Sequence, residues 1–395
     1  MREAALPPLD APAALRSEAI VERIRVRAQV QGGWLPFREF MQIALYEPGL
    51  GYYMAEHAIF GPEGDYVTAP ELSPLFARCL AHSVADALRH CGGDDVVEFG
   101  AGSGRLAVEL VGALGRLDVS PRRYRIVEPS PALAARQQRA LEREFPAAGF
   151  AGRFEWLARP PGETWQGVAI ANEVIDALPV DRFRIAEPGP EALGVAVTAQ
   201  HFHWQARPAD HALAAAIAAL QVRLPSPMSA GFVSELRPGL DDWFAQASAA
   251  LTRGAIFVCD YGLPSAQYYH PSRDGGTLAA FRRHRRVENV LADPGAQDLT
   301  AWVDFTALAE AARERGFVTA GYATQAHFLL ATGIERELAR LLEGATERER
   351  VLHRQAAATL LLPGEMGERF KILALARGLD GPMSGFDFRD LSTSL

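Results

Sequence analysis

The 395-residue sequence predicts an α/β fold built around an open, mostly parallel sheet. Two observations support this fold class. An apolar strand at 96–99 runs into a loop with glycine at every second position from 100 to 104, and an apolar helical pattern follows. Two further apolar strands, at 124–127 and 168–171, also end in polar residues. Because the carboxyl ends of parallel strands line the ligand crevice of such a sheet, these polar tips predict a binding site there.

The first 92 residues are predicted to form a mainly helical region. Apolar residues recur at helical spacing in three segments, so helices are expected at 13–30, 37–46 and 73–90. Two segments rich in glycine, proline and tyrosine interrupt them, at 46–53 and 64–71. Turn chemistry explains the glycines and prolines, whereas so many aromatic residues in a loop indicate a lid or an inner wall.

The glycine loop discriminates between classes of cofactor. A dinucleotide-binding loop has the order G-x-G-x-x-G, which from Gly100 requires a glycine at position 105, where this chain has Arg105. The loop therefore fits NAD poorly. The observed E-x-G-x-G-x-G spacing, from Glu98 to Gly104, resembles motif I of the class I methyltransferases. That resemblance implies S-adenosylmethionine as the cofactor.

An acidic residue also ends the next strand. Glu128 lies 28 residues after Gly100, which is about the length of one helix and one strand. A carboxylate at this strand tip can accept hydrogen bonds from both hydroxyls of a ribose. Further core strands are expected at 153–157 and 168–171, and the second of these runs into the Asn-Glu pair at 172–173.

Beyond residue 180 the pattern changes to the alternation expected of short strands. The chain is therefore predicted to have four parts: 1–92, the helical region with an aromatic lid; 93–180, the first part of the cofactor-binding core; 181–236, an inserted β-hairpin and helix; and 237–395, the rest of the core. The last part is expected to hold a long polar loop at 263–300, a helical insertion at 335–361 and a final strand at 370–375.

Composition and charge exclude several classes of protein. Lysine and arginine number 40 against 48 acidic residues, and the net charge of −8 argues against a general nucleic-acid-binding surface. The basic run 282–286 is expected to be a solvated or partner-facing loop. No membrane span and no signal peptide are expected, and the location is predicted to be cytoplasmic, which also suits three scattered cysteines. No metal is expected, because the cysteines and histidines lack ligand spacing.

With these segments in place, the chain resembles the MidA family of class I methyltransferases over nearly its whole length. The residues that carry the resemblance are Tyr46-Glu47-Pro48, Gly51-Tyr52-Tyr53, 64–71, the glycine loop, 172–179, Asp260-Tyr261-Gly262, 276–278, 298–300, 303–305, 366–368 and Phe370-Lys371. The segment after Gln325 departs from the family pattern, since the expected glycine is absent.

The resemblance implies a Rossmann-like, seven-stranded methyltransferase sheet whose final strand is antiparallel. It also implies S-adenosylmethionine as cofactor and, less directly, a protein substrate methylated on arginine, since the family includes the mitochondrial arginine methyltransferase that acts as a complex I assembly factor.

The motifs predict two sets of site residues. The cofactor is expected to contact Glu98, Gly100, Ala101, Gly102, Gly104, Glu128, Pro129, Ser130, Asn172, Glu173, Thr68 and Glu71. The acceptor is expected to face Glu173 and Asp176, with Glu235 or Asp260 as a second acid. A pair of carboxylates can hold a guanidinium by its fork and make one nitrogen more nucleophilic. Asp176 as a helix cap and Glu235 on a solvated surface are equally open interpretations.

The same motifs also indicate which other classes of methyl acceptor and function are disfavoured and which stay open. Amines of nucleic-acid bases are disfavoured as acceptors, because the corresponding enzymes carry [DNS]-P-P-[YF] where this chain has Asn-Glu-Val-Ile at 172–175. A small-molecule acceptor stays open, as does a non-catalytic assembly factor that uses the fold as a scaffold. The sequence also leaves a homodimer open.

Overall fold

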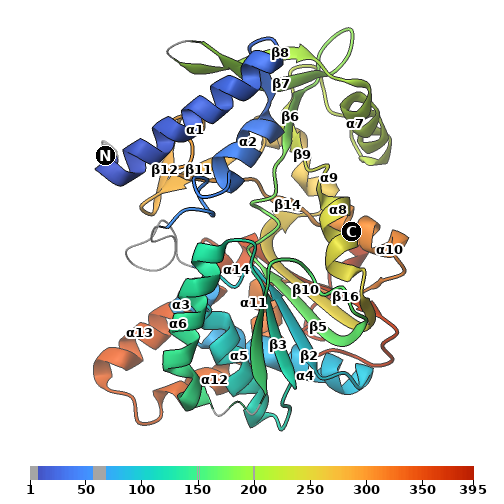
Figure 1. The fold of residues 1–395 in the computed structure, drawn as a ribbon. Helices are drawn as coiled ribbons and strands as arrows, with labels where there is room; N and C mark the ends of the chain where they lie inside the picture. Colours follow the sequence, from blue (N-terminus) through green and yellow to red (C-terminus); the bar gives the residue numbers. More distant parts are fainter. Residues whose placement is uncertain (1–7, 57–67, 149, 151, 199–200) are drawn as a thin grey trace. The chain divides into compact units, whose positions relative to one another are not determined.

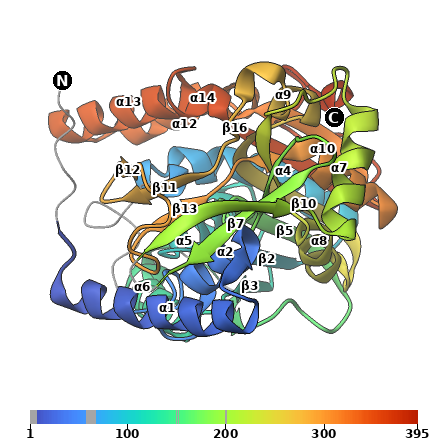
Figure 2. The ribbon, with the colours of Figure 1, turned by 90° about the horizontal axis from the view of Figure 1, so that it is seen from above.

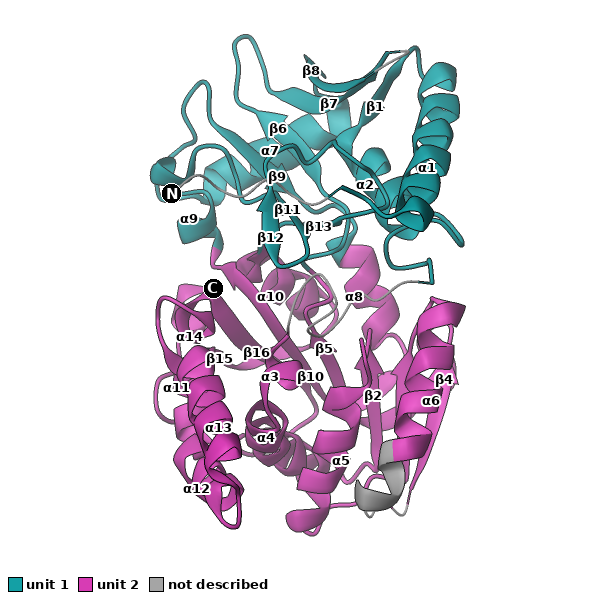
Figure 3. Cartoon of the chain, turned by 90° about the vertical axis from the view of Figure 1, so that its left-hand side faces the viewer, with its two compact units in different colours: residues 1–66, 176–240, 265–302 teal, residues 67–175, 241–264, 303–395 magenta. Residues whose placement is uncertain are grey.

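The computed structural model describes residues 8–56, 68–148, 150, 152–198 and 201–395 (Figure 1). The chain forms two compact units, each assembled from three separate stretches (Figure 3). Unit 1 comprises residues 1–66, 176–240 and 265–302. Unit 2 comprises residues 67–175, 241–264 and 303–395.

Unit 2 contains the predicted α/β sheet. Its strands lie in the order β4-β3-β2-β5-β10-β16-β15, and the first five are parallel. β16 lies between β10 and β15 and is antiparallel to both, which confirms the seven-stranded sheet with an antiparallel final strand. The bounds are β2 (Asp95–Phe99), β3 (Arg123–Val127), β4 (Arg153–Leu157), β5 (Trp165–Asn172), β10 (Leu251–Leu263), β15 (Val318–Thr324), β16 (Phe370–Arg377) and β14 (Val303–Asp304), which pairs with β10.

Helices with apolar faces cover this sheet. Leu80 and Val84 of α4 and Leu110 of α5 are fully buried, as their helical spacing predicts. Helices α12, α13 and α14 lie next to one another (Figure 2). The helices are α3 (Ala69–Leu72), α4 (Leu75–Cys91), α5 (Arg105–Arg116), α6 (Pro131–Ala148), α8 (Leu240–Ser248), α10 (Phe305–Glu314), α11 (Gln325–Ala331), α12 (Ile334–Leu342), α13 (Glu347–Leu361), α14 (Met366–Arg369) and the 3-10 turn η2 (Ser392–Ser394).

Unit 1 is built on an antiparallel sheet in the order β1-β7-β6-β9, with β8 paired to β7. Helices α1 and α2 pack against β7 (Figure 2). The sequence predicts both helices but not β1, because three residues are too few to show alternation. The bounds are α1 (Ala11–Val30), β1 (Trp34–Pro36), α2 (Phe37–Tyr46), β6 (Asp181–Arg184), β7 (Glu191–Val197), β8 (Phe202–Pro208), α7 (His211–Arg223) and β9 (Val233–Leu236).

The segment 263–300, expected as a long loop, contains regular structure. It forms a three-stranded sheet in the order β12-β11-β13. At the tip of its hairpin, Arg283 and His284 have φ of +50° and +60°, a pair of left-handed residues such as a two-residue hairpin turn requires. Asn or Gly usually marks such turns, and their absence here explains why the hairpin is not predicted. The elements are α9 (Ser265–Tyr268), η1 (Pro271–Arg273), β11 (Ala279–Arg282), β12 (Arg285–Val287) and β13 (Asp298–Thr300).

The aromatic segment 46–53 packs inside unit 1. Tyr52 is fully buried. The hydroxyl of Tyr46 donates a hydrogen bond to the carbonyl of Ala177 (3.0 Å), and that of Tyr53 donates to Oδ1 of Asp298 (2.8 Å). These bonds fix the segment as a wall of unit 1. Residues 64–67 of the second aromatic segment lie outside the described residues.

Candidate active site

The glycine loop joins β2 to α5 in unit 2. Gly100, Gly102 and Gly104 all have left-handed backbones, with φ of +61°, +58° and +87°. A Cβ on Gly104 would lie 2.3 Å from Cδ1 of Leu141 in α6, and one on Gly100 would lie 3.2 Å from Cγ2 of Val174. The loop therefore needs glycine both for its backbone angles and for its packing.

The acid at the tip of β3 is held in place by its neighbours. Glu128 is buried, and its Oε1 accepts a hydrogen bond from the backbone N–H of Ser130 (3.0 Å) across Pro129. Its Oε2 accepts from Nε2 of Gln137 in α6 (3.0 Å). Burial raises the pKa of Glu128, and these two bonds oppose the shift. Each carboxylate oxygen has acceptor capacity left over, which suits a pair of ribose hydroxyls.

Glu98 is the acid that precedes the glycine loop. It is buried within β2, and its Oε2 accepts a hydrogen bond from the hydroxyl of Tyr124 in β3 (2.7 Å). Burial raises the pKa of Glu98 to about 7, and the bond from Tyr124 lowers it in part. The folded protein thus binds a proton here more tightly than the unfolded chain does.

This shift predicts a loss of stability as the pH rises. Between about pH 4.5 and pH 7 the folded state retains a proton that the unfolded state has released, so the free energy of unfolding falls through this window, by about 3 kcal/mol for Glu98 alone. We expect Glu98→Gln, without cofactor, to be more stable than the parent at pH 8 and nearly equal at pH 5. Denaturant unfolding at both pH values measures this.

The control for that experiment is Glu142→Gln, which changes an exposed carboxylate on α6. It should leave the difference between pH 5 and pH 8 unchanged. An equal pH dependence in the parent and in Glu98→Gln would contradict the assignment of the proton to Glu98.

Helix α3, which precedes the glycine loop in the sequence, contacts this loop. The hydroxyl of Ser103 donates a hydrogen bond to Oε1 of Glu71. Thr68 is the N-cap residue of α3, and its side chain makes no capping bond. Glu71 thus lies beside the glycine loop, and the expected contacts of Glu71 and Thr68 with the cofactor stay predictions.

The carboxyl end of β5 carries a strained residue. Glu173 has φ of +53°, an unfavourable backbone for a residue with a side chain. Its N–H donates to the carbonyl of Cys259 in β10 (2.9 Å), and Asn172 Nδ2 lies 3.5 Å from its Oε1. Strained backbones of this kind concentrate at functional sites, where the surrounding structure maintains them.

Asp260 stabilises the turn that follows Glu173. It is fully buried within β10, three residues before the strand ends, and its Oδ2 accepts a hydrogen bond from the N–H of Ile175 (3.1 Å). Its Oδ1 accepts from the N–H of Tyr261 (2.9 Å). Asp260 and Glu173 therefore lie close to each other in unit 2, and Asp260 accepts hydrogen bonds from the backbone beside Glu173.

The other two predicted acids belong to unit 1. Asp176 is buried, and its Oδ2 accepts a hydrogen bond from Thr300 Oγ1 (2.8 Å). Glu235 is buried too, and its Oε2 accepts from the N–H of Thr277 (2.8 Å) while its Oε1 lies 3.7 Å from Nε of Arg182. Burial raises the pKa of Glu235, against the Thr277 bond and the charge of Arg182. Glu235 is thus not on a solvated surface.

Two polar residues with many partners were not found from the sequence. Gln137 contacts the glycine loop, β3 and β4 in unit 2. Arg237 in unit 1 donates to the carbonyls of Asp176, Leu178, Ala301 and Trp302. Their partners are up to 65 residues away, so no local pattern marks them.

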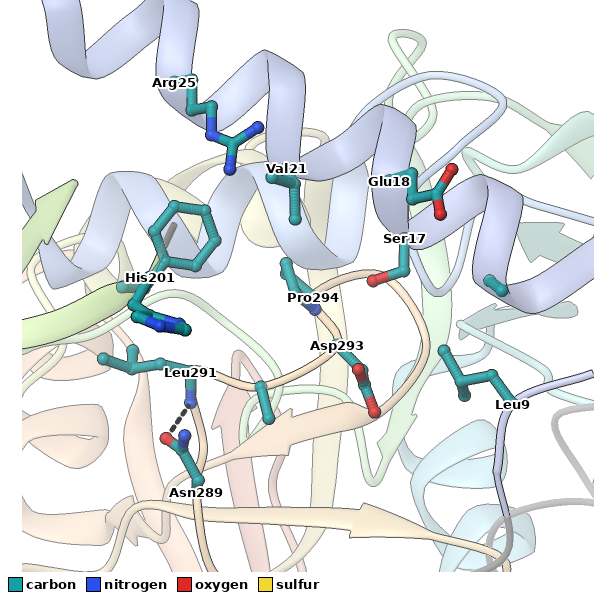
Figure 4. A pocket seen from close by; sticks show the side chains of 13 residues that line it. Leu9, Ser17, Glu18, Val21, Arg25, His201, Asn289, Leu291, Asp293 and Pro294 are labelled. Atoms are coloured by element: carbon teal, nitrogen blue, oxygen red, sulfur yellow. Dashed lines mark hydrogen bonds between the residues drawn. The ribbon is translucent and has the colours of Figure 1, made fainter. Parts of the chain in front are cut away.

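A separate pocket of about 540 Å³ lies in unit 1 (Figure 4). Helix α1 forms one side with Ser17, Glu18 and Arg25, and the loop around Asn289 and Asp293 forms another. None of the predicted catalytic or cofactor residues lines it. Within the described part of the chain, no group of three or more metal-ligating side chains is placed to hold an ion.

Comparisons with known proteins agree with this geometry. Residues 79–323, more than half of the chain, match a family model described as "Putative S-adenosyl-L-methionine-dependent methyltransferase". A crystal structure of a "likely methyl transferase" from Burkholderia thailandensis, bound to S-adenosyl-homocysteine, has 39% sequence identity and a TM-score of 0.92, and the match covers 99% of this chain and 100% of that one.

Curated relatives carry a more specific name. The mitochondrial protein arginine methyltransferase NDUFAF7 homolog of Drosophila melanogaster is 27% identical, over 90% of this chain and 84% of its own. The human mitochondrial protein arginine methyltransferase NDUFAF7 is 28% identical, over 87% of this chain and 80% of its own.

The relatives also correct one prediction. They are named mitochondrial, which contradicts the cytoplasmic location expected from the sequence. The expectation rested on the lack of an expected membrane span or signal peptide and on the scattered cysteines, and none of these features identifies a compartment. Among the described residues, no helix is both long and apolar enough to span a bilayer.

The cofactor and the reaction class predicted from the glycine loop are confirmed by the family model and by the S-adenosyl-homocysteine complex of the similar structure. The chain belongs to this family of S-adenosylmethionine-dependent methyltransferases.

Proposed function

We propose that this enzyme methylates an arginine side chain of a protein. The names of the curated relatives, which match over most of their length, support the acceptor class. The observation that carries the proposal in this chain is Glu173, an acid kept in a strained conformation at the carboxyl end of β5, beside the glycine loop. An arginine guanidinium is a cation, and a carboxylate is the side chain that binds it best.

The same geometry supports the cofactor residues that we propose. The glycine loop, with Ala101 between its first two glycines, would hold S-adenosylmethionine through its backbone, and Glu128 would accept hydrogen bonds from the ribose hydroxyls. Glu98, Asn172 and Glu71 line the same end of the sheet, with Thr68 at the start of α3. S-adenosylmethionine supplies a methyl group on a sulfonium, which leaves the protein to align the acceptor and exclude water.

The four predicted acids then have different roles. Glu173 contacts the acceptor, orients one guanidinium nitrogen and accepts the proton that this nitrogen loses when the methyl group is transferred. Asp260 positions Glu173 by holding the N–H of Ile175. Asp176 and Glu235 stabilise loops of unit 1 through Thr300 and Thr277.

The test is product analysis. Purified protein is incubated with isotope-labelled S-adenosylmethionine and either a panel of arginine-containing proteins and peptides or a metabolite mixture. We expect label in the protein fraction, recovered as methylarginine after acid hydrolysis. Label confined to metabolites would contradict the protein substrate. Binding of S-adenosylmethionine without any transfer would instead favour a scaffold. Homodimer formation stays a prediction, which light scattering of the same sample measures.

A further inference from the structure

Gln137 connects three parts of the cofactor side of unit 2. It lies in α6 and is fully buried. Its Nε2 donates to Oε2 of Glu128 at the end of β3 (3.0 Å) and to the carbonyl of Gly102 in the glycine loop (3.1 Å). Its Oε1 accepts a hydrogen bond from Nε1 of Trp156 in β4 (3.1 Å). One amide thus contacts both the ribose acid and the loop.

The orientation of this amide is determined by Trp156. An indole N–H can only donate, so it selects the oxygen of the Gln137 amide. The amide nitrogen, with two protons, must then face Glu128 and Gly102. Both of those acceptors are satisfied by this one orientation, whereas a flipped amide would place its oxygen against a carboxylate and a carbonyl. The indole therefore holds the donor side of Gln137 toward the cofactor residues.

We propose that Gln137 is a positioning residue for S-adenosylmethionine, which fixes the Glu128 carboxylate and the Gly102 peptide in the geometry that the cofactor meets. The inference rests on the cofactor contacts proposed above for Glu128 and the glycine loop. Removing the amide leaves the Glu128 carboxylate and the Gly102 carbonyl without this donor, and a buried acceptor that loses its donor costs more free energy than the bond itself contributes. Because both groups face the cofactor in the proposal, we expect the effect in cofactor binding.

The primary test compares Gln137→Leu with Gln138→Leu in the full chain. Residue 138 follows on the same helix but is exposed, so it reports any general effect of leucine in α6. We expect Gln137→Leu to raise the dissociation constant of S-adenosylhomocysteine about tenfold and the KM for S-adenosylmethionine equally, with kcat within about twofold. Gln138→Leu should bind as the parent does.

A role confined to packing gives a different result. A structural amide would lower the melting temperature and leave the KM for S-adenosylmethionine unchanged, and that outcome in folded Gln137→Leu would overturn the proposal. Trp156→Phe removes the indole N–H and keeps an aromatic ring. It should raise the same KM by a smaller factor, because the amide can then flip.

A third variant gives a signature in the pH profile. Glu128 is the titratable side chain that contacts residue 137 in the described structure. In Gln137→Glu two carboxylates would meet at this distance, and they cannot both ionise without repulsion. The introduced carboxyl group, once protonated, can donate to Glu128 as the amide does, so affinity for S-adenosylhomocysteine should improve from pH 8 to pH 6. Gln137→Leu should show no such recovery, and a flat profile in both variants would contradict the proposal.

The binding assay also keeps this inference separate from the proposed acceptor. Calorimetry with S-adenosylhomocysteine needs no acceptor, so the comparison is informative even if no arginine substrate is methylated. If the parent protein did not bind S-adenosylhomocysteine, that result would contradict the proposed cofactor contacts themselves.

Discussion

Replacing Glu128 with alanine is expected to weaken binding of S-adenosylhomocysteine at least 100-fold. The carboxylate is buried at the tip of β3, and its two oxygens are oriented by Ser130 and Gln137. Hydrogen bonds from ribose hydroxyls to an ionised carboxylate contribute about 1.5–3 kcal/mol each, so the loss of two costs about 3 kcal/mol or more. Isothermal calorimetry measures the effect at pH 8, where a larger fraction of this carboxyl group is ionised than at lower pH.

Two companion variants show whether the charge or the shape matters. Glu128→Gln keeps the volume and one acceptor, so an intermediate loss of affinity is expected. Glu142→Ala removes an exposed acid from α6 and should bind as the parent does. If Glu128→Ala retained a parental dissociation constant while its melting temperature stayed normal, the ribose would have to bind elsewhere.

The sequence predicted the parts of the fold that local patterns encode. The strands β2, β3 and β5 and the helices α4 and α5 follow from apolar runs and helical spacing, because burial imposes those periods directly. The number of strands and the antiparallel β16 came from the family resemblance instead, because no residue pattern within a single strand indicates which strands pair with it. The short strands β11, β12 and β13 were missed because three or four residues show no period.

The candidate site shows the same division. The glycine loop and Glu128 are recognisable because the chemistry of the cofactor fixes their spacing along the chain. Gln137 and Arg237 act through bonds to distant backbone and side-chain groups, which only the folded chain brings together. Asp260 was predicted as a second acid facing the acceptor, which stays a prediction; its carboxylate accepts from the N–H groups of Ile175 and Tyr261, a role that the type of residue alone does not distinguish from acceptor binding.

The strained backbone of Glu173 is expected to lower the stability of the protein, while its carboxylate supports turnover. Glu173→Gly should therefore raise the stability and lower kcat. A left-handed backbone costs a residue with a Cβ about 1–2 kcal/mol. Glycine removes that cost but loses about 0.5–1 kcal/mol through the greater freedom of its unfolded chain. Glu173→Gly should therefore be more stable than the parent by about 0.5–1 kcal/mol, with kcat lowered at least 100-fold, the usual range for loss of an acid–base group.

The matched control is Asp118, which has φ of +54° in the exposed turn after α5. Asp118→Gly relieves the same backbone strain away from the strand tips, so it should gain similar stability and keep its full turnover. Glu173→Gln completes the set, because it keeps the strained backbone and removes only the charge. It should match the parent in stability and Glu173→Gly in kcat.

Turnover is measured at saturating S-adenosylmethionine, so that any effect of Glu173 on cofactor affinity does not enter kcat. If Glu173→Gln and Glu173→Gly both kept parental kcat, the carboxylate would have no part in orienting the acceptor, and the strain would be a consequence of the β5–β10 packing alone. If only the glycine variant lost activity, the fixed backbone rather than the charge would be what the reaction requires. Loss of kcat in both, with stability gained only in the glycine variant, is the result that a strained catalytic acid predicts.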